Sequence, residues 1–455
     1  MLLNIVLILF MIFVAIKVEK KLLLPSTLTL IILSLGLNYF FPSFLDFTNT
    51  DVFAEEMLIF IVILVLGDAF ILKINDLKEN WLSIFILAGV FVVVGVLGGA
   101  VLKDFIFTQE ISLGAAIALF AMITATDPVS VISVFKMHKL PHKLSILAEG
   151  ESLFNDAMAL TMFSAFGLYM MEGHEVDLEY IILAPIEIVV GSIIVGLSIG
   201  LVGLGLMKTT KDLMGEFILI LFIAYLSYFL AEHIHIIGHN QLSGLLSEIV
   251  AVLTMTTIID KSYKIEKKQI ERNMDVLKDA GANDTKYKTK RVSSLIEKLA
   301  TNITDIKRQN DIAAFLGVLS ILVNGILFVS LAHLVKIDTL ILYWKEILGA
   351  FLLTTIIRFL QIGTFSFAAY KTKLIKEMNT RWFLVLSFAG IKGGLSVVMI
   401  HMMNVTVPSF EYKEMFEAIV LGVILLSTFV YVSGLLITIG LNKDKFAKEA
   451  DLSNH

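Results

Sequence analysis

Long, nearly uninterrupted runs of apolar residues restrict how this chain can fold more than any other feature of it. Many runs reach about 18 to 25 residues, the length that an α-helix needs to cross the hydrocarbon core of a bilayer. Hydrophobic residues make up 57% of the 455 positions and charged residues only 17%, whereas about a quarter of a soluble domain is charged. The sequence therefore predicts an all-α polytopic membrane protein.

Hydropathy divides the chain into thirteen predicted spans. The first is not interpreted as a cleaved signal peptide, because MLLNIVLILF has no basic residue ahead of its apolar core and no small-residue cleavage site. The predicted spans cover residues 2–16, 22–41, 55–73, 81–101, 111–135, 145–171, 178–207, 214–233, 240–260, 311–335, 339–369, 380–403 and 413–440.

Basic residues fix the expected orientation. Of the 36 Lys and Arg residues, only four lie in the outside loops or at the outer ends of the adjoining spans, and two lie deep inside spans. All the others fall on the opposite side, which is the cytoplasm by the positive-inside rule. We therefore expect a cell-membrane protein whose N-terminus lies outside and whose C-terminus is cytoplasmic. The four outward residues are Lys103, Lys336, Lys345 and Lys413.

The chain divides into membrane segments 1–260 and 311–440, a basic cytoplasmic loop at 261–310 and a short cytoplasmic tail at 441–455. The loop holds 13 basic and 7 acidic residues, and we predict one or two solvated helices there with a turn at AGAND. The positive charge of the loop is explained by its position on the cytoplasmic side alone. The alternative is that it contacts anionic lipid or has a regulatory role. Cysteine is absent, which excludes disulfides, iron–sulfur clusters and thiolate metal sites.

Ionisable residues within the predicted spans point to function, because charges at membrane depth are costly and usually face a cavity or one another. On the sixth span, Ser152 and Asp156 are four residues apart and share one helix face, with Asn155 adjacent. Their oxygens suit hard ions such as Na⁺, Li⁺, K⁺ or H⁺. The ionisable residues inside the spans include Asp68, Asp127, Glu149, Glu151, Asp156, Arg358 and Lys392.

The stretch TATDPVS interrupts the fifth span. Pro128 cannot donate a backbone hydrogen bond and disfavours helical geometry at Asp127, so we predict a break at 125–128. Unwound backbone at membrane depth is tolerated only inside protein or along a cavity. Thr124 and Thr126 can satisfy some of the freed backbone groups, and the exposed carbonyls can bind a cation.

The twelfth span carries a matching interruption, AGIKGG, with three glycines around Lys392. The two breaks are seven spans apart, so their helices run antiparallel, as expected if spans 1–6 and 8–13 are inverted repeats. Secondary transporters bind their substrates where two such broken helices cross. Asp127 would then neutralise the exposed helix N-termini and Lys392 the C-termini.

The motifs TATDPVSV, GESLFNDAMAL and FAGIKGGLS resemble those of the cation/proton antiporters of the NhaP and NHE type. The resemblance implies the NhaA/NhaP-like antiporter fold and a homodimer with a dimerisation domain and a moving core domain. It also implies exchange of Na⁺ or Li⁺ for H⁺, without a cofactor, in support of pH homeostasis.

Roles also follow from the resemblance, residue by residue. Asp156 would bind the cation and the proton in turn, Ser152 would be a hydroxyl ligand and Thr126 a carbonyl ligand. Asp127 would act through water or at the helix crossing. Asn155 marks the antiporters that exchange one proton per cation.

Three further positions complete the set of residues implied by the resemblance. Glu151 and Arg358 would form a structural ion pair. Asp68 stands where the family usually has Glu, in LGDAF instead of an FEGG-like stretch, and would be a further Na⁺ ligand. Lys392 replaces the usual Arg of G-x-R-G; it would either compensate helix ends or, since a buried lysine can lose its proton, carry a second proton.

The residues themselves suggest the same mechanism. A carboxyl group removed from water holds a proton more readily, so one carboxylate can alternate between H⁺ and a cation. K⁺/H⁺ exchange is the main alternative, because ligand type does not settle ion size. A monovalent cation channel is the rival class, although a channel needs no proton coupling. An enzyme and a nucleic-acid partner are not expected.

Overall fold

The computed structural model describes residues 2–22, 26–40, 51–127, 131, 134–135, 138, 140–207, 209–210, 212–234, 241–257, 288–375 and 377–453. Every regular element in these ranges is helical, which confirms the predicted all-α class. The main helices are α1 (Leu2–Leu22), α2 (Ser26–Phe40), α3 (Asp51–Ile71), α4 (Ile74–Ile84), α5 (Phe91–Val101), α6 (Leu113–Met122), α8 (His142–Met162), α9 (Tyr169–Met171), α10 (Leu178–Met207), α11 (Leu213–His233), Gly244–Thr257, α13 (Lys288–Leu334), α14 (Ile337–Leu342), α15 (Trp344–Thr372), α16 (Thr380–Phe388), α17 (Leu395–Thr406), α18 (Lys413–Leu441) and α19 (Lys443–Ser453).

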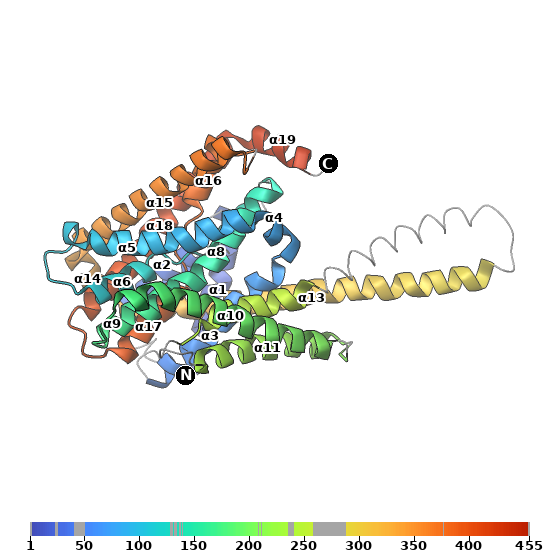
Figure 1. Cartoon of the computed structure of the whole chain (residues 1–455), viewed down its shortest axis with the longest axis horizontal. Coiled ribbons are helices and arrows are strands. Elements are labelled where there is room, and N and C mark those ends of the chain that lie inside the picture. Colours follow the sequence, from blue (N-terminus) through green and yellow to red (C-terminus); the bar gives the residue numbers. More distant parts are fainter. Residues whose placement is uncertain are drawn as a thin grey trace.

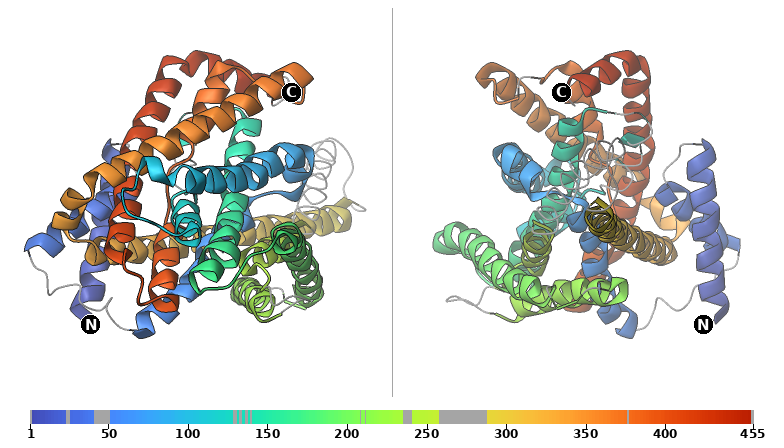
Figure 2. Two further views of the ribbon diagram at one scale, coloured as in Figure 1. Left: turned by 60° about the vertical axis from the view of Figure 1, so that its left-hand side comes forward. Right: turned by 90° about the vertical axis from the view of Figure 1, so that its right-hand side faces the viewer.

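The helices pack as two groups that meet along the middle of the molecule. The first helix group consists of α1, α2, α3, α10, α11 and α13, and the second consists of α4–α6, α8 and α15–α18. Figure 2 shows α1 and α10–α11 at different edges, with α13 passing between them. The two groups touch most where α17 packs on α3, and also where α17 and α18 pack on α13, α18 on α2 and α8 on α3.

Two helices of the second group are interrupted, as predicted. Helix α6 ends at Met122, and residues 124–127 are not helical. Helices α16 and α17 are separated by residues 389–394. The predicted break at 125–128 therefore begins earlier than expected, while Pro128 itself lies outside the described residues.

Helix α13 is longer than a membrane span requires. It has 47 residues, and its N-terminal part extends beyond the other helices (Figure 1). Residues 288–310 of the predicted basic loop thus continue the following span as one helix. The rest of that loop, including the expected turn at AGAND, lies outside the described residues.

The C-terminal segment forms α19, which packs against α18 and the start of α16. Glu449 accepts hydrogen bonds from Trp382 Nε1 at 3.0 Å and Asn379 Nδ2 at 3.3 Å, and pairs with Arg381. The Phe446 side chain is fully buried. The predicted tail is therefore a docked helix.

Six helices in the described part are long and apolar enough to cross a membrane individually, including Ile74–Val101, in which α4 and α5 are joined through a π-helical turn. Five shorter apolar helices accompany them, among them α6, α17 and Gly244–Thr257. Helix breaks explain why some predicted spans appear as short pieces. The number thirteen stays a prediction.

Candidate ion-binding site

The two broken segments cross in direct backbone contact. The backbone N–H of Asp127 donates a 2.7 Å hydrogen bond to the carbonyl of Ile391. Gly393 makes this approach possible, since a Cβ added there would lie 2.8 Å from the Asp127 Cβ and 3.1 Å from its Cα. The two unwound segments therefore satisfy some of each other's backbone hydrogen-bonding groups, as buried polar groups require.

The end of α6 is capped by the opposite break. The Lys392 ammonium donates to the Thr124 carbonyl at 3.1 Å, and the Ser396 hydroxyl donates to the Met122 carbonyl at 2.6 Å. The Met122 carbonyl is the last of α6 and the Thr124 carbonyl follows just beyond it, so both lie at the C-terminal end of the helix, where its dipole is negative. Lys392 thus lies where the sequence placed a positive charge for helix compensation.

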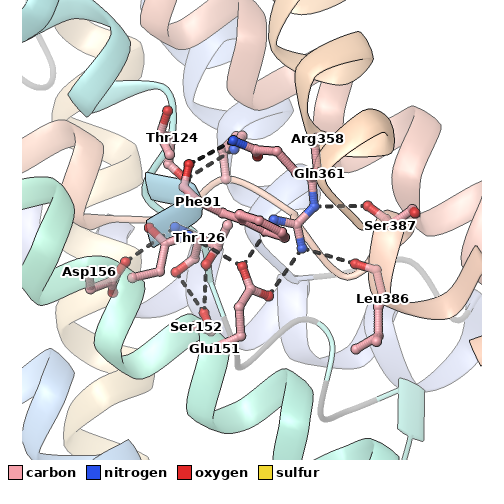
Figure 3. Close-up of polar contacts among 12 residues, drawn as sticks. Phe91, Thr124, Thr126, Glu151, Ser152, Asp156, Arg358, Gln361, Leu386 and Ser387 are labelled. Atoms are coloured by element: carbon pink, nitrogen blue, oxygen red, sulfur yellow. Dashed lines mark hydrogen bonds and ion pairs between the residues drawn. The ribbon is translucent and has the colours of Figure 1, made fainter. Parts of the chain in front are cut away.

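Thr126 connects the first break to α8, as Figure 3 shows. Its backbone N–H donates to Asp156 Oδ1 at 3.2 Å, and its carbonyl accepts a 3.0 Å bond from the Ser152 hydroxyl. The two hydroxyl oxygens of Thr126 and Ser152 are 3.0 Å apart. The expected ligands Thr126, Ser152 and Asp156 are therefore adjacent. The Ser152 hydroxyl, however, is bonded to the Thr126 carbonyl.

A small cavity lies beside the crossing and contains the carboxyl groups expected at the site. Its volume is about 20 Å³, enough for one water-sized particle. Asp68 belongs to this lining, so the third span reaches the site as the resemblance implies. The lining residues are Leu64, Asp68, Thr126, Asp127, Asp156, Asn324, Gly393, Gly394 and Leu395.

The predicted ion pair between Glu151 and Arg358 is present and bidentate, with nitrogen–oxygen distances of 3.0 and 3.1 Å (Figure 3). Arg358 also donates to the carbonyls of Ser387 at 3.0 Å and Leu386 at 2.9 Å. It therefore ties α8 to the end of α16, just before the second break. Gly390 leaves room for this guanidinium, because a Cβ there would lie 2.2 Å from Arg358 Nε.

Asn155 does not line the cavity. Its amide nitrogen lies 3.4 Å from Glu151 Oε1 as a donor, and its side chain is buried. Asn155 therefore belongs to the ion-pair side of α8, whereas Asp156 faces the cavity.

Asn324 of α13 is a cavity residue that the sequence reasoning missed. It is an uncharged polar residue in SILVNGILF, without the charge or the helix break that marks the other site residues. An amide in the middle of an apolar span is a comparable signal, because it too must find a partner or a cavity.

An all-helical membrane protein whose two broken helices cross beside an oxygen-lined cavity belongs to the class of secondary transporters. Comparison with known proteins agrees with that class. A family described as sodium/hydrogen exchanger, transmembrane, matches residues 5–268. The chain belongs to this family of cation/proton antiporters, and it is a transporter rather than an enzyme.

Individual relatives extend the likeness to nearly the whole chain. The Na⁺/H⁺ antiporter NhaH of Halobacillus aidingensis is 24% identical over 428 residues, 91% of each chain. The low-affinity Na⁺/H⁺ antiporter NhaS1 of Synechocystis is 34% identical over 216 residues, covering 46% of this chain and 39% of the relative. The solved sodium/proton antiporter MjNhaP1 of Methanocaldococcus jannaschii has a TM-score of 0.67 at 18% identity, covering 99% of this chain and 98% of its own, and it shows the shared fold.

Proposed function

We propose that the protein exchanges Na⁺ or Li⁺ for H⁺ by alternating access, and that cation and proton compete for Asp156. The observation that carries the proposal is the cavity at the helix crossing, where Asp68, Asp127 and Asp156 surround space for one particle. Three carboxyl groups so close together repel one another unless a cation or a proton is bound among them. Occupancy by either ion, but not by both, is the condition for coupled exchange.

The surroundings of Asp156 support electroneutral exchange of one proton per cation. The neighbouring position is Asn155, which does not titrate. The Lys392 ammonium binds the Thr124 carbonyl, and the Arg358 guanidinium binds Glu151. These contacts support structural roles for the Lys392 and Arg358 side chains. Asp156 then remains as the group that binds the cation and the proton in turn.

The membrane setting of the proposal comes from the sequence. Lys and Arg asymmetry supports a cell-membrane location with the N-terminus outside and the C-terminus in the cytoplasm. The family resemblance supports a homodimer in which the first helix group supplies the interface and the second group moves. A role in pH homeostasis would follow from such exchange.

Proteoliposomes with a pH-sensitive dye inside test the proposal. Na⁺, Li⁺ and K⁺ are added in turn, with and without a valinomycin-clamped potential, to wild type, Asp156→Asn and the matched control Asp338→Asn on exposed α14. We expect Na⁺- or Li⁺-driven proton flux in wild type and the control, and none in Asp156→Asn.

The other outcomes each contradict part of the proposal. Proton flux driven best by K⁺ would make the protein a K⁺/H⁺ antiporter. Cation flux uncoupled from protons in all three proteins would make it a channel.

A further inference from the structure

Asn324 is a buried polar residue to which the transport mechanism above gives no role. Asn324 is 8% exposed and lies in the C-terminal half of Arg308–Ser330, the membrane-crossing part of α13. The Asn324 residue lines a cavity, so a particle in that cavity can serve as a partner for its amide. A buried amide is costly when nothing satisfies it, which favours a ligand in the space beside it.

The space beside Asn324 is the ion cavity. Its side chain lines that cavity together with Asp68, Asp127 and Asp156. Gly394 lies against the amide, since a Cβ added at that glycine would be 2.6 Å from Asn324 Oδ1. The amide therefore occupies room that only a glycine leaves open, at the start of α17.

Asn324 and Asp68 approach the cavity from the first helix group, on α13 and α3, which pack against each other. Asp156 and the Thr126–Asp127 segment approach from the second group. The cavity therefore lies at the boundary between the groups, and any movement of one group against the other changes the distance between its two sides.

We propose that Asn324 is a ligand of the transported cation and provides a neutral oxygen from the first helix group. The inference rests on the proposed function for the identity of the cation. Amide oxygens suit hard cations, and a side-chain amide takes up no proton at physiological pH. Asn324 thus favours the cation over the proton, whereas the carboxyl groups bind both.

Removal of such a ligand has a distinctive kinetic result. Asn324→Ala should raise the KM for Na⁺ about tenfold, the ratio that corresponds to the loss of about one hydrogen-bond-like contact. The maximal rate at saturating Na⁺ should stay within twofold of wild type, because the proton site is unchanged. At fixed Na⁺, inhibition by acid should begin at a higher pH. Radioactive ²²Na⁺ binding to the purified protein gives a second readout, independent of proton flux.

Ser320→Ala is the matched control. Ser320 is buried one helical turn away on α13 and donates to the Leu64 carbonyl at 3.5 Å, without lining the cavity. Its KM for Na⁺ should stay at the wild-type value. Equal KM values in Asn324→Ala and wild type, or the same change in both variants, would overturn the proposal.

A folding defect can be separated from a binding defect. If Asn324→Ala is not recovered as folded protein, Gly394→Ala is measured by the same criteria, since its methyl group would push the amide away from its present position. A normal KM for Na⁺ in that variant would also overturn the proposal. If wild type binds ²²Na⁺ in an Asn324-dependent way without moving protons, the ligand role stands and the antiport proposal fails.

Discussion

Asp127 and Ile391 join the two broken helices through one backbone hydrogen bond of 2.7 Å. The bond lies where both segments are unwound, one after the end of α6 and the other before the start of α17. Unwound backbone is tolerated at membrane depth only where protein or a cavity satisfies it. The crossing satisfies these groups and also directs the Asp127–Thr126 segment toward Asp156.

Gly393→Ala should disrupt transport by forcing the two breaks apart. The added Cβ would meet Asp127 Cβ at 2.8 Å, closer than such atoms approach, so the backbone must shift at the ion cavity. We expect a large loss of cation-driven proton flux in proteoliposomes at similar protein content. Gly205→Ala is the control, because nothing lies within 4 Å of a Cβ at that position. Wild-type flux in Gly393→Ala would show that the close approach has no importance.

Glu151→Gln should destabilise the protein more than any surface substitution. It leaves the Arg358 guanidinium buried without a carboxylate, which typically costs about 3–5 kcal/mol. The change should appear as a lower Tm in detergent. Lys143→Met removes an exposed pair with Glu377 at 3.5 Å and should cost about 1 kcal/mol or less. Equal Tm values for the two variants would contradict a bracing role for the buried pair.

Lys392→Arg should keep transport electroneutral. An arginine stays charged and can still donate to the Thr124 carbonyl, whereas it cannot carry a proton. We expect flux that is indifferent to the membrane potential in both wild type and the variant. Flux that follows the potential in wild type but not in Lys392→Arg would identify Lys392 as a second proton carrier.

Acid should inhibit transport by competition. As the pH falls, protons occupy Asp156 for a larger fraction of the time, so the apparent KM for Na⁺ rises while the maximal rate is preserved. Initial rates measured over a range of Na⁺ concentrations at several pH values test this directly. A maximal rate that falls with pH at constant KM would mean that protons act at a separate site.

Much of the fold was predictable because hydropathy and helix-breaking residues act within a single segment of the chain. Runs of apolar residues specify spanning helices, and TATDPVS and AGIKGG specify where two of them break. The ion pair between Glu151 and Arg358 was predicted as well, although only through a resemblance that links distant residues. Residues 261–287 of the basic loop lie outside the described residues, so the turn predicted at AGAND is not tested.

The orientation of side chains at the site was not predictable in the same way. The spacing of Ser152 and Asp156 puts them on one helix face, yet Ser152 is bonded to the Thr126 carbonyl and Asp156 to the Thr126 N–H. Asn155 is adjacent in sequence but belongs to the ion pair. These outcomes depend on how α8 is rotated against the first break.

The sequence by itself determined that the chain lies in a membrane, that two of its helices are broken and which titratable groups lie at membrane depth. Only the tertiary structure decided that Asn324 reaches the same cavity as Asp156 and that Asn155 does not. The physical reason is that hydropathy and backbone breaks are properties of a segment, whereas a binding cavity depends on the tilt, rotation and spacing of helices that are far apart in the chain.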